Sequence, residues 1–195
     1  PCCLAMVYRL RGENYCLDQI LKDLNLGEKG ETTYHPQLAL HLMKRGFKTK
    51  LLMSNSQALS PAWANWSRER IIEALGTWVS LKMGRSARWN KFGSYLLSYL
   101  KAGGEVELKS YSIEDLKHLL DNGSTLIVCV DEVWVWGHRF LKNEAKIDEI
   151  RGKTQGHFIV ITGYEGNKFK VLDPYPTNLK GRNGYYQVDT QQLLN

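Results

Sequence analysis

The sequence predicts an α+β fold, with helices in its first half and an antiparallel sheet in its second. Three observations lead to this prediction. Apolar residues recur at helical spacing before Gly103, and short alternating segments separated by turn residues follow it. Residues His157 to Pro174 have the pattern of two short strands joined by a tight turn.

In the first half, Cys3, Val7 and Leu10 form an apolar stripe that predicts a first helix ending near Gly12. Further helices are expected at residues 17–24, at residues 33–46 and twice within the aromatic-rich region 60–102, with one strand at residues 47–53. Glycine after a periodic segment, as at Gly46, is typical of a helix end.

In the second half, Ser112 followed by Asp115 has the spacing of a helix cap. The other predicted elements are strands at residues 106–111, 125–136 and 185–188, a helix from Ser112 to about residue 120, a polar surface loop at 137–156 and the hairpin 157–173. Within that hairpin, Glu165, Gly166 and Asn167 are the expected turn.

The length of 195 residues favours a single domain, residues 1–195, with a helical lobe at about 1–104 and a sheet-rich lobe at about 105–195.

The net charge is 26 minus 20, or +6, but the basic residues are dispersed and no nucleic-acid motif accompanies them. No apolar run is long enough to span a bilayer, which takes about 20 residues. The cysteine pattern favours a reducing compartment, so the expected location is the cytoplasm.

His157 and Asp173 are the principal candidates for chemistry. His157 opens the first strand of the predicted hairpin and Asp173 closes the second, so an antiparallel pairing brings the two side chains together. A carboxylate beside an imidazole fixes its tautomer and supports its positive charge. We therefore expect a catalytic histidine with its orienting aspartate.

A cysteine is the expected nucleophile. A thiol has an ordinary pKa of about 8.5, and the start of a helix together with a nearby imidazolium stabilises the thiolate. Cys2 meets this condition at the start of the first helix, whereas Cys3 lies on its apolar stripe and is expected to be buried. Cys129 lies in a predicted strand and is expected to be buried in the core. The position of Cys16 does not suggest a catalytic role.

No metal site and no cofactor are expected. The four cysteines contain no Cys-x-x-Cys pair. His35, His41 and His118 lie on predicted helix or turn positions without spaced ligand partners.

Several segments resemble the papain-like bacteriocin-processing (double-glycine) cysteine peptidases and their peptidase-like relatives. They are Pro1 to Val7, Gln37 to Leu40 with Arg45 to Phe47, Leu126 to Val128, and the hairpin from His157 to Pro174. The resemblance implies a bacterial protein with a papain-like fold, in which a helical N-terminal lobe packs on an antiparallel sheet. It also implies that His157 is the general base, that Asp173 orients it, and that the partner is a peptide or protein substrate.

The family's nucleophile stands in the pattern Cys-Gly-x-x-x-Leu-x-Met. Matching Leu4 and Met6 to this pattern places that cysteine two residues before Pro1. We therefore expect that the sequence is trimmed at its start and that the nucleophilic cysteine precedes Pro1. Within the sequence, Cys2 is the candidate for the nucleophile. The alternative hypotheses are that Cys2 or Cys3 acts as the nucleophile, or that the protein is not a peptidase.

The expected function is a cysteine peptidase, which is a hydrolase, and the resemblance implies that it cuts after small residues such as Gly-Gly. The alternatives are a catalytically inactive module that binds a peptide or partner, and a thiol enzyme that transfers the acyl group in the manner of a transpeptidase or transglutaminase.

Overall fold

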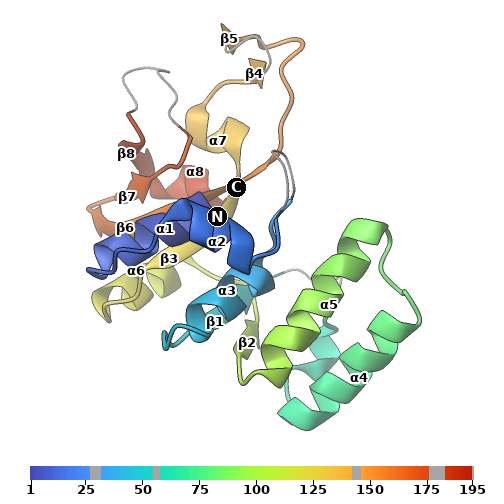
Figure 1. The fold of residues 1–195 in the computed structure, drawn as a ribbon. Coiled ribbons are helices and arrows are strands. Elements are labelled where there is room, and N and C mark those ends of the chain that lie inside the picture. The colour runs from blue at the N-terminus through green and yellow to red at the C-terminus, as the bar shows by residue number, and fades with distance from the viewer. Residues whose placement is uncertain (27–31, 55–57, 142–145, 176–182, 195) are drawn as a thin grey trace. The chain divides into compact units, whose positions relative to one another are not determined.

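The computed structural model describes residues 1–26, 32–54, 58–141, 146–175 and 183–194 and confirms the predicted α+β composition (Figure 1). The chain divides into two compact units. One contains Pro1 and Cys16–Ser110, and the other contains Cys2–Tyr15 and Tyr111–Asn195. The first helix thus groups with the sheet and not with the other early helices.

The unit that contains residues 16–110 is mainly helical, as predicted. Its elements are α2 (Leu17–Asp23), α3 (His35–Met43), β1 (Lys50–Met53), the 3-10 helix η1 (Pro61–Trp63), α4 (Arg68–Ser80), α5 (Ala87–Lys101) and β2 (Glu105–Leu108). Leu75, Leu96 and Tyr99 are fully buried at its centre. Their positions on α4 and α5 follow the helical spacing seen in the sequence.

The two strands of this unit pair in parallel, with Lys50 opposite Glu105, which sequence periodicity did not indicate. Tyr99 joins them where they begin. Its hydroxyl lies 3.0 Å from the carbonyl oxygens of both Thr49 and Glu105, and it accepts a hydrogen bond from the Glu105 N–H at 3.2 Å.

The other unit is built on a four-stranded antiparallel sheet in the order β3-β6-β7-β8. Its elements are α1 (Cys2–Leu10), α6 (Ile113–Asp121), β3 (Leu126–Asp131), α7 (Glu132–Trp136), β4 (Phe140–Leu141), β5 (Lys146–Ile147), β6 (Gly156–Glu165), β7 (Lys168–Leu172), β8 (Tyr185–Asp189) and α8 (Thr190–Leu194). The predicted hairpin is the β6–β7 pair, and Gly166 takes the positive φ of 56° at its turn.

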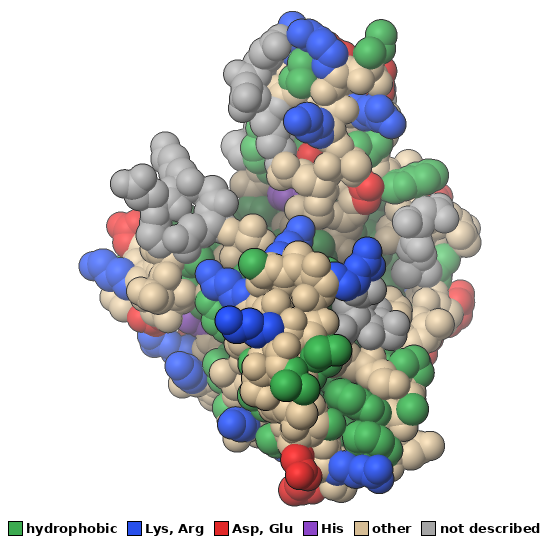
Figure 2. All heavy atoms as spheres, turned by 90° about the vertical axis from the view of Figure 1, so that its right-hand side faces the viewer, with side chains coloured by type: hydrophobic (Ala, Val, Ile, Leu, Met, Phe, Trp, Pro, Cys, Tyr) green, Lys and Arg blue, Asp and Glu red, His purple; other side chains and the backbone are tan. Residues whose placement is uncertain are grey.

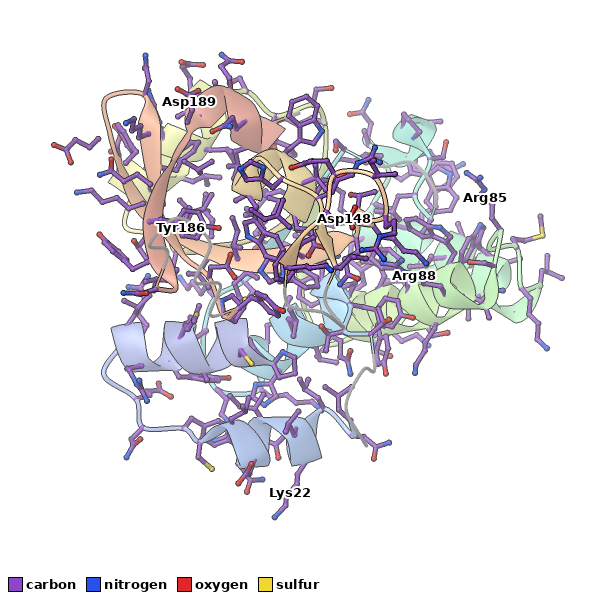
Figure 3. All side chains as sticks on the ribbon, turned by 90° about the horizontal axis from the view of Figure 1, so that it is seen from above. Lys22, Arg85, Arg88, Asp148, Tyr186 and Asp189 are labelled. Carbon is purple, nitrogen blue, oxygen red and sulfur yellow. The ribbon has the colours of Figure 1, made fainter. Side chains whose placement is uncertain are left out.

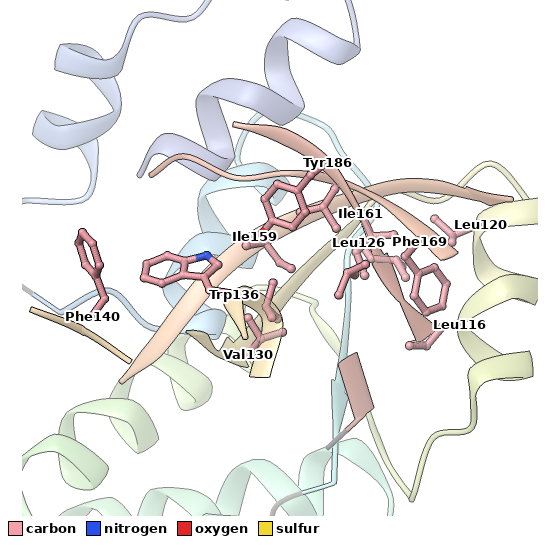
Figure 4. Packing of buried hydrophobic residues seen from close by; sticks show 13 residues of the cluster. Leu116, Leu120, Leu126, Val130, Trp136, Phe140, Ile159, Ile161, Phe169 and Tyr186 are labelled. Atoms are coloured by element: carbon pink, nitrogen blue, oxygen red, sulfur yellow. The ribbon is translucent and has the colours of Figure 1, made fainter. Parts of the chain in front are cut away.

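One face of this sheet carries the core of the unit. Ile159 and Ile161 of β6 are fully buried there with Phe169 and Val171 of β7, and Leu116 and Leu120 of α6 pack against them (Figure 4). Side chains alternate between the faces of a strand, so Val160 points to the opposite face, and it is also fully buried. Helix α1 contacts β6.

Helix α1 is amphipathic in the way that the sequence predicted. Cys3, Leu4, Val7 and Tyr8 are buried. Cys3 Sγ donates a hydrogen bond to the carbonyl oxygen of Phe158 at 3.2 Å. The start of α1 therefore lies against the first residues of β6.

The predicted strand at residues 125–136 is wrong in its second half. Strand β3 ends at Asp131 and α7 begins at Glu132. The Asp131 carboxylate accepts a hydrogen bond from the Val133 N–H at 2.9 Å, and Gly137 ends the helix with a left-handed φ of 73°. The run looked continuous in the sequence because buried apolar residues lie on both sides of the capping aspartate, Val130 on the strand and Val135 and Trp136 on the helix.

We expect Asp131→Ala to lower the free energy of unfolding by about 1 kcal/mol, the usual cost of removing a helix cap. Besides the Val133 N–H, its carboxylate accepts the Thr154 hydroxyl, so the change also frees the segment before β6. Urea denaturation measures the loss. Asp131→Asn retains an acceptor and is the control; equal stability of wild type and Asp131→Ala would contradict the capping role.

The predicted polar loop at residues 137–156 contains two short strands, β4 and β5, which pair antiparallel with Phe140 opposite Ile147. Residues 142–145 lie outside the described part of the chain. Phe140 is buried and packs edge to face against Trp136, with ring centroids 6.1 Å apart. This aromatic contact anchors the segment. The polar composition of residues 137–156 did not indicate such a contact.

The basic excess is distributed over the surface, as the sequence indicated. Figure 2 shows lysine and arginine side chains over much of one face, with hydrophobic and acidic side chains between them. In Figure 3, Arg85 and Arg88 lie near the start of α5 and Lys22 projects from α2. Among the described residues, no helix is both long enough and apolar enough to cross a membrane.

Candidate active site

His157 is the second residue of β6 and pairs with Val130 of β3. Its side chain is 13% exposed. Because it lies at the beginning of the strand, its imidazole projects near the end of the sheet and is not enclosed in its middle. This position suits a group that has to meet both a fixed partner and an incoming molecule.

Asp173 follows β7 directly and lies next to His157, as the hairpin predicted. Oδ1 of Asp173 is 2.6 Å from Nε2 of His157. Strands β6 and β7 pair with Val160 opposite Leu172, so continuing the register places Asp173 opposite Ile159. His157 is two residues away on the same face, which is the diagonal neighbour position of an antiparallel pair.

The Asp173 carboxylate is buried and accepts four hydrogen bonds. Oδ1 accepts from His157 Nε2 and from the Tyr175 N–H at 2.9 Å. Oδ2 accepts from the Tyr186 hydroxyl at 2.7 Å and from Trp136 Nε1 at 3.2 Å. The backbone of Asp173 is also held, because its N–H donates to the carbonyl oxygen of Gly184 at 2.8 Å.

These contacts determine the ionisation of Asp173. Burial is the largest influence on its pKa and acts to raise it. The hydrogen bonds from His157, Tyr175 and Tyr186, together with the charge of His157, outweigh burial and hold the pKa below its ordinary value. Asp173 is therefore a carboxylate at neutral pH.

The ionised carboxylate determines the tautomer of His157. A carboxylate only accepts hydrogen bonds, so Nε2 of His157 carries the proton that it donates to Asp173. Nδ1 of the neutral ring is then the basic nitrogen. Within the described part of the chain no hydrogen bond occupies Nδ1, so it can take up and return a proton.

Aromatic rings surround the histidine. The rings of Trp136 and Tyr175 lie 5.5 and 6.5 Å from that of His157. Tyr175 also stacks on Trp136 at 5.5 Å, and Phe140 contacts both of these rings edge to face. These rings cover much of the imidazole, which leaves its side chain 13% exposed.

Of the predicted cysteines, Cys3 is buried, as expected, and burial raises the pKa of its thiol to about 12. It is therefore protonated at any physiological pH. Cys2 is exposed at the start of α1. A hydrogen bond joins His157 to Asp173, whereas among the described residues none joins either thiol to His157.

The expectation that Cys129 is a core residue is wrong, since it is exposed on β3. It pairs with Phe158, and its Sγ lies close to Gly156, where an added Cβ would be 3.3 Å away. The apolar residues around it in the sequence suggested burial. Side chains alternate between the two faces, however, and Val130 takes the buried position next to it. Cys16 is exposed as well.

Sequence reasoning missed the residues that hold Asp173. Trp136 was expected on a strand and lies on α7, and Tyr175 follows the predicted hairpin. Tyr186 belongs to the predicted last strand, and nothing in the sequence linked it to Asp173. Figure 4 shows Trp136 with its indole nitrogen directed toward the side on which Tyr186 lies, and Figure 3 places Tyr186 on the sheet.

The chemistry available at this site is acid–base chemistry. It supplies one imidazole, whose tautomer is set by a buried carboxylate. Within the described residues, no group of three or more histidine, cysteine, aspartate or glutamate side chains could hold a metal ion.

The model of the Peptidase_C39 like family matches residues 1–194. This match covers nearly the whole chain and confirms the papain-like α+β fold that the resemblance implied. No match to the chain was found among curated proteins or among solved structures.

Proposed function

The chain belongs to the Peptidase_C39 like family, and from this premise we propose that it is a cysteine peptidase that hydrolyses peptide bonds with His157 and Asp173 in its catalytic apparatus. The family supports a fold of the cysteine peptidase type. The single observation that carries the proposal is the 2.6 Å contact between His157 Nε2 and Asp173 Oδ1, which leaves Nδ1 available for proton transfer.

The nucleophile belongs at the start of α1. Cys3 is unsuitable because it is buried and protonated, but its contact with the Phe158 carbonyl oxygen anchors the beginning of the helix beside the residue that follows His157. Cys2 is the candidate within the sequence. The position two residues before Pro1, where the family pattern has its cysteine, is four residues before Cys3. Helical spacing would put it on the same face as Cys3.

The proposed reaction has two steps. The thiolate attacks the peptide carbonyl carbon, the C–N bond breaks, and the imidazolium of His157 gives its Nδ1 proton to the leaving amine. Neutral His157 then takes a proton from water as the water attacks the thioester; the C–S bond breaks, which releases the acid and regenerates the thiolate and the imidazolium. Asp173 supports the positive charge on His157 in both steps.

We further propose that the enzyme cuts after small residues such as Gly-Gly. This specificity comes from the resemblance stated above, since no contact in the described chain defines a substrate pocket.

A second candidate is a peptidase-like module that binds a peptide without cutting it. One observation favours it: among the described residues no thiol forms a hydrogen bond with His157. The two candidates differ in whether a reactive thiol works together with His157.

The experiment uses the full chain, with any residues that precede Pro1 in the protein, and a peptide that contains Gly-Gly followed by a reporter amide. We expect cleavage after Gly-Gly that iodoacetamide abolishes, and mass spectrometry should find the fastest-labelled cysteine at the start of α1. Cys3 should be protected until the protein is unfolded, because its thiol is buried.

Three other outcomes are informative. Peptide binding without turnover would favour the binding module. Cleavage that survives alkylation, or fastest labelling at Cys16 or Cys129, would contradict the assignment of the nucleophile. Added amines that become acylated faster than water hydrolyses the thioester would indicate an acyl-transferring enzyme.

A further inference from the structure

The two oxygens of the Asp173 carboxylate have different partners. Oδ1 accepts from His157 and from the backbone N–H of Tyr175, whereas Oδ2 accepts from two side chains, those of Trp136 and Tyr186. The proposed reaction needs only Oδ1. The two bonds to Oδ2 therefore call for a separate explanation.

The donors to Oδ2 come from separate parts of the fold. Trp136 is the last residue of α7, and Tyr186 is the second residue of β8. Both are buried, with relative exposures of 1% and 9%, and Asp173 itself is only 2% exposed. The carboxylate therefore cannot turn about its Cβ–Cγ bond without breaking two buried hydrogen bonds, and its burial opposes their replacement by hydrogen bonds to solvent.

Trp136 acts on both members of the pair. Its indole N–H donates to Asp173, and its ring lies 5.5 Å from the ring of His157. The same side chain therefore restrains the carboxylate through a hydrogen bond and the imidazole through packing.

We propose that Trp136 and Tyr186 are positioning residues, whose hydrogen bonds to Oδ2 direct Oδ1 of Asp173 at His157 and so hold the imidazole with Nδ1 available for the reaction. This inference rests on the proposed function for its catalytic consequence. The restraint on Asp173 is a property of the folded protein, and it can be measured whether or not the protein is a peptidase.

A purely structural role is the competing explanation, because both side chains also belong to the hydrophobic cluster beneath the sheet. In that case the loss of the polar atom would change stability but would leave the titration of Asp173 and the His157–Asp173 hydrogen bond unaltered. The test must therefore observe these two groups directly.

The variants are Tyr186→Phe and Trp136→Phe, which remove one donor each and keep an aromatic ring. The chain offers a matched control for each. The Tyr164 hydroxyl donates to the Asp121 carboxylate on the surface at 3.0 Å, and Trp134 is an exposed tryptophan on the same short helix as Trp136. Tyr164→Phe and Trp134→Phe make the same chemical changes away from Asp173.

The first measurement is a titration of the Asp173 side-chain carboxyl carbon by NMR, together with the His157 Nε2 proton resonance. Hydrogen bonds to a charged group lower its pKa, so Tyr186→Phe should move the Asp173 titration upward by about one pH unit. The downfield His157 resonance should broaden or shift. The two control variants should leave both signals as they are in the wild type.

The second measurement is peptide hydrolysis as a function of pH. We expect Tyr186→Phe to lower kcat about tenfold with KM within twofold of the wild type, and to move the acidic limb of the profile to higher pH. If Trp136→Phe does not fold, the Tyr186→Phe variant alone tests whether the hydrogen bonds to Oδ2 position Asp173.

The outcomes separate the two proposals. An Asp173 titration and a His157 resonance that are unchanged in Tyr186→Phe would overturn the positioning role, even with a fully active wild type. An inactive wild type in which Tyr186→Phe still shifts both signals would overturn the peptidase assignment and retain the restraint on Asp173.

Discussion

Replacing His157 by alanine should abolish thiol-dependent turnover while the protein remains folded. The variant loses the only group in the described site that can exchange a proton at Nδ1, and loss of the base of a catalytic triad typically lowers kcat/KM by roughly 10⁴- to 10⁶-fold. The fold should persist because His157 lies at the beginning of a strand, outside the hydrophobic core cluster of this sheet. Initial rates of peptide hydrolysis and a thermal melt measure the two effects.

The chain contains a matched control. His118 is an exposed histidine on α6, with its Nε2 3.1 Å from Nδ2 of Asn122, and His118→Ala should retain wild-type turnover. His157→Gln, which preserves polarity and much of the volume, should be as inactive as His157→Ala. Turnover within tenfold of the wild type in either His157 variant would remove this residue from the mechanism.

The second large effect is expected for Asp173→Asn. An asparagine offers one acceptor oxygen and one amide donor to a site with four donors, so at least one N–H or O–H faces another donor. Turnover should fall roughly 10²- to 10⁴-fold, because the imidazolium loses its counter-charge and its fixed tautomer. The free energy of unfolding should fall by about 1–3 kcal/mol.

Urea denaturation and initial rates give these numbers. Asp121→Asn is the control, since this exposed carboxylate also accepts a tyrosine hydroxyl, at 3.0 Å from each oxygen, and lies in the same unit. If Asp173→Asn were as stable and as active as Asp121→Asn, the hydrogen-bond network around Asp173 would contribute neither to stability nor to turnover.

The stability difference between wild type and Asp173→Asn should also depend on pH. The pKa of Asp173 in the folded state lies below its ordinary value, which is about 3.9. The unfolded chain therefore binds the proton first as the pH falls. The stabilisation is complete above about pH 5 and is lost as the pH passes down through the folded-state pKa. Denaturation series from pH 7 to pH 2 should show the difference shrinking only below about pH 5.

Much of the fold could be predicted because it depends on neighbouring residues. The stripe of Cys3, Val7 and Leu10 predicted the helix α1, although Leu10, at the C-terminal end of this helix, is half exposed. Ser112 and Asp115 form the predicted capping box of α6, with hydrogen bonds of 2.8 and 3.1 Å. Hairpin β6–β7 could be foreseen from its turn residues and its length.

The contact between His157 and Asp173 was predictable for the same reason. A hairpin with a two-residue turn brings its ends together whatever the rest of the chain does. Their catalytic role stays a prediction, as does that of Cys2, since the contact shows that the two groups are neighbours and not what they do.

Local sequence patterns thus predicted most of the helices, the hairpin and the pairing of an imidazole with a carboxylate, because helical periodicity, caps and turns act over a few residues. Only the tertiary structure decided that α7 follows β3, that Cys3 anchors α1 to β6, and that Trp136 and Tyr186 converge on Asp173. Trp136 lies 37 residues before Asp173, and Tyr186 lies 13 residues after it. Contacts over such separations depend on how the sheet and its helices pack, and no local pattern of residue types encodes them.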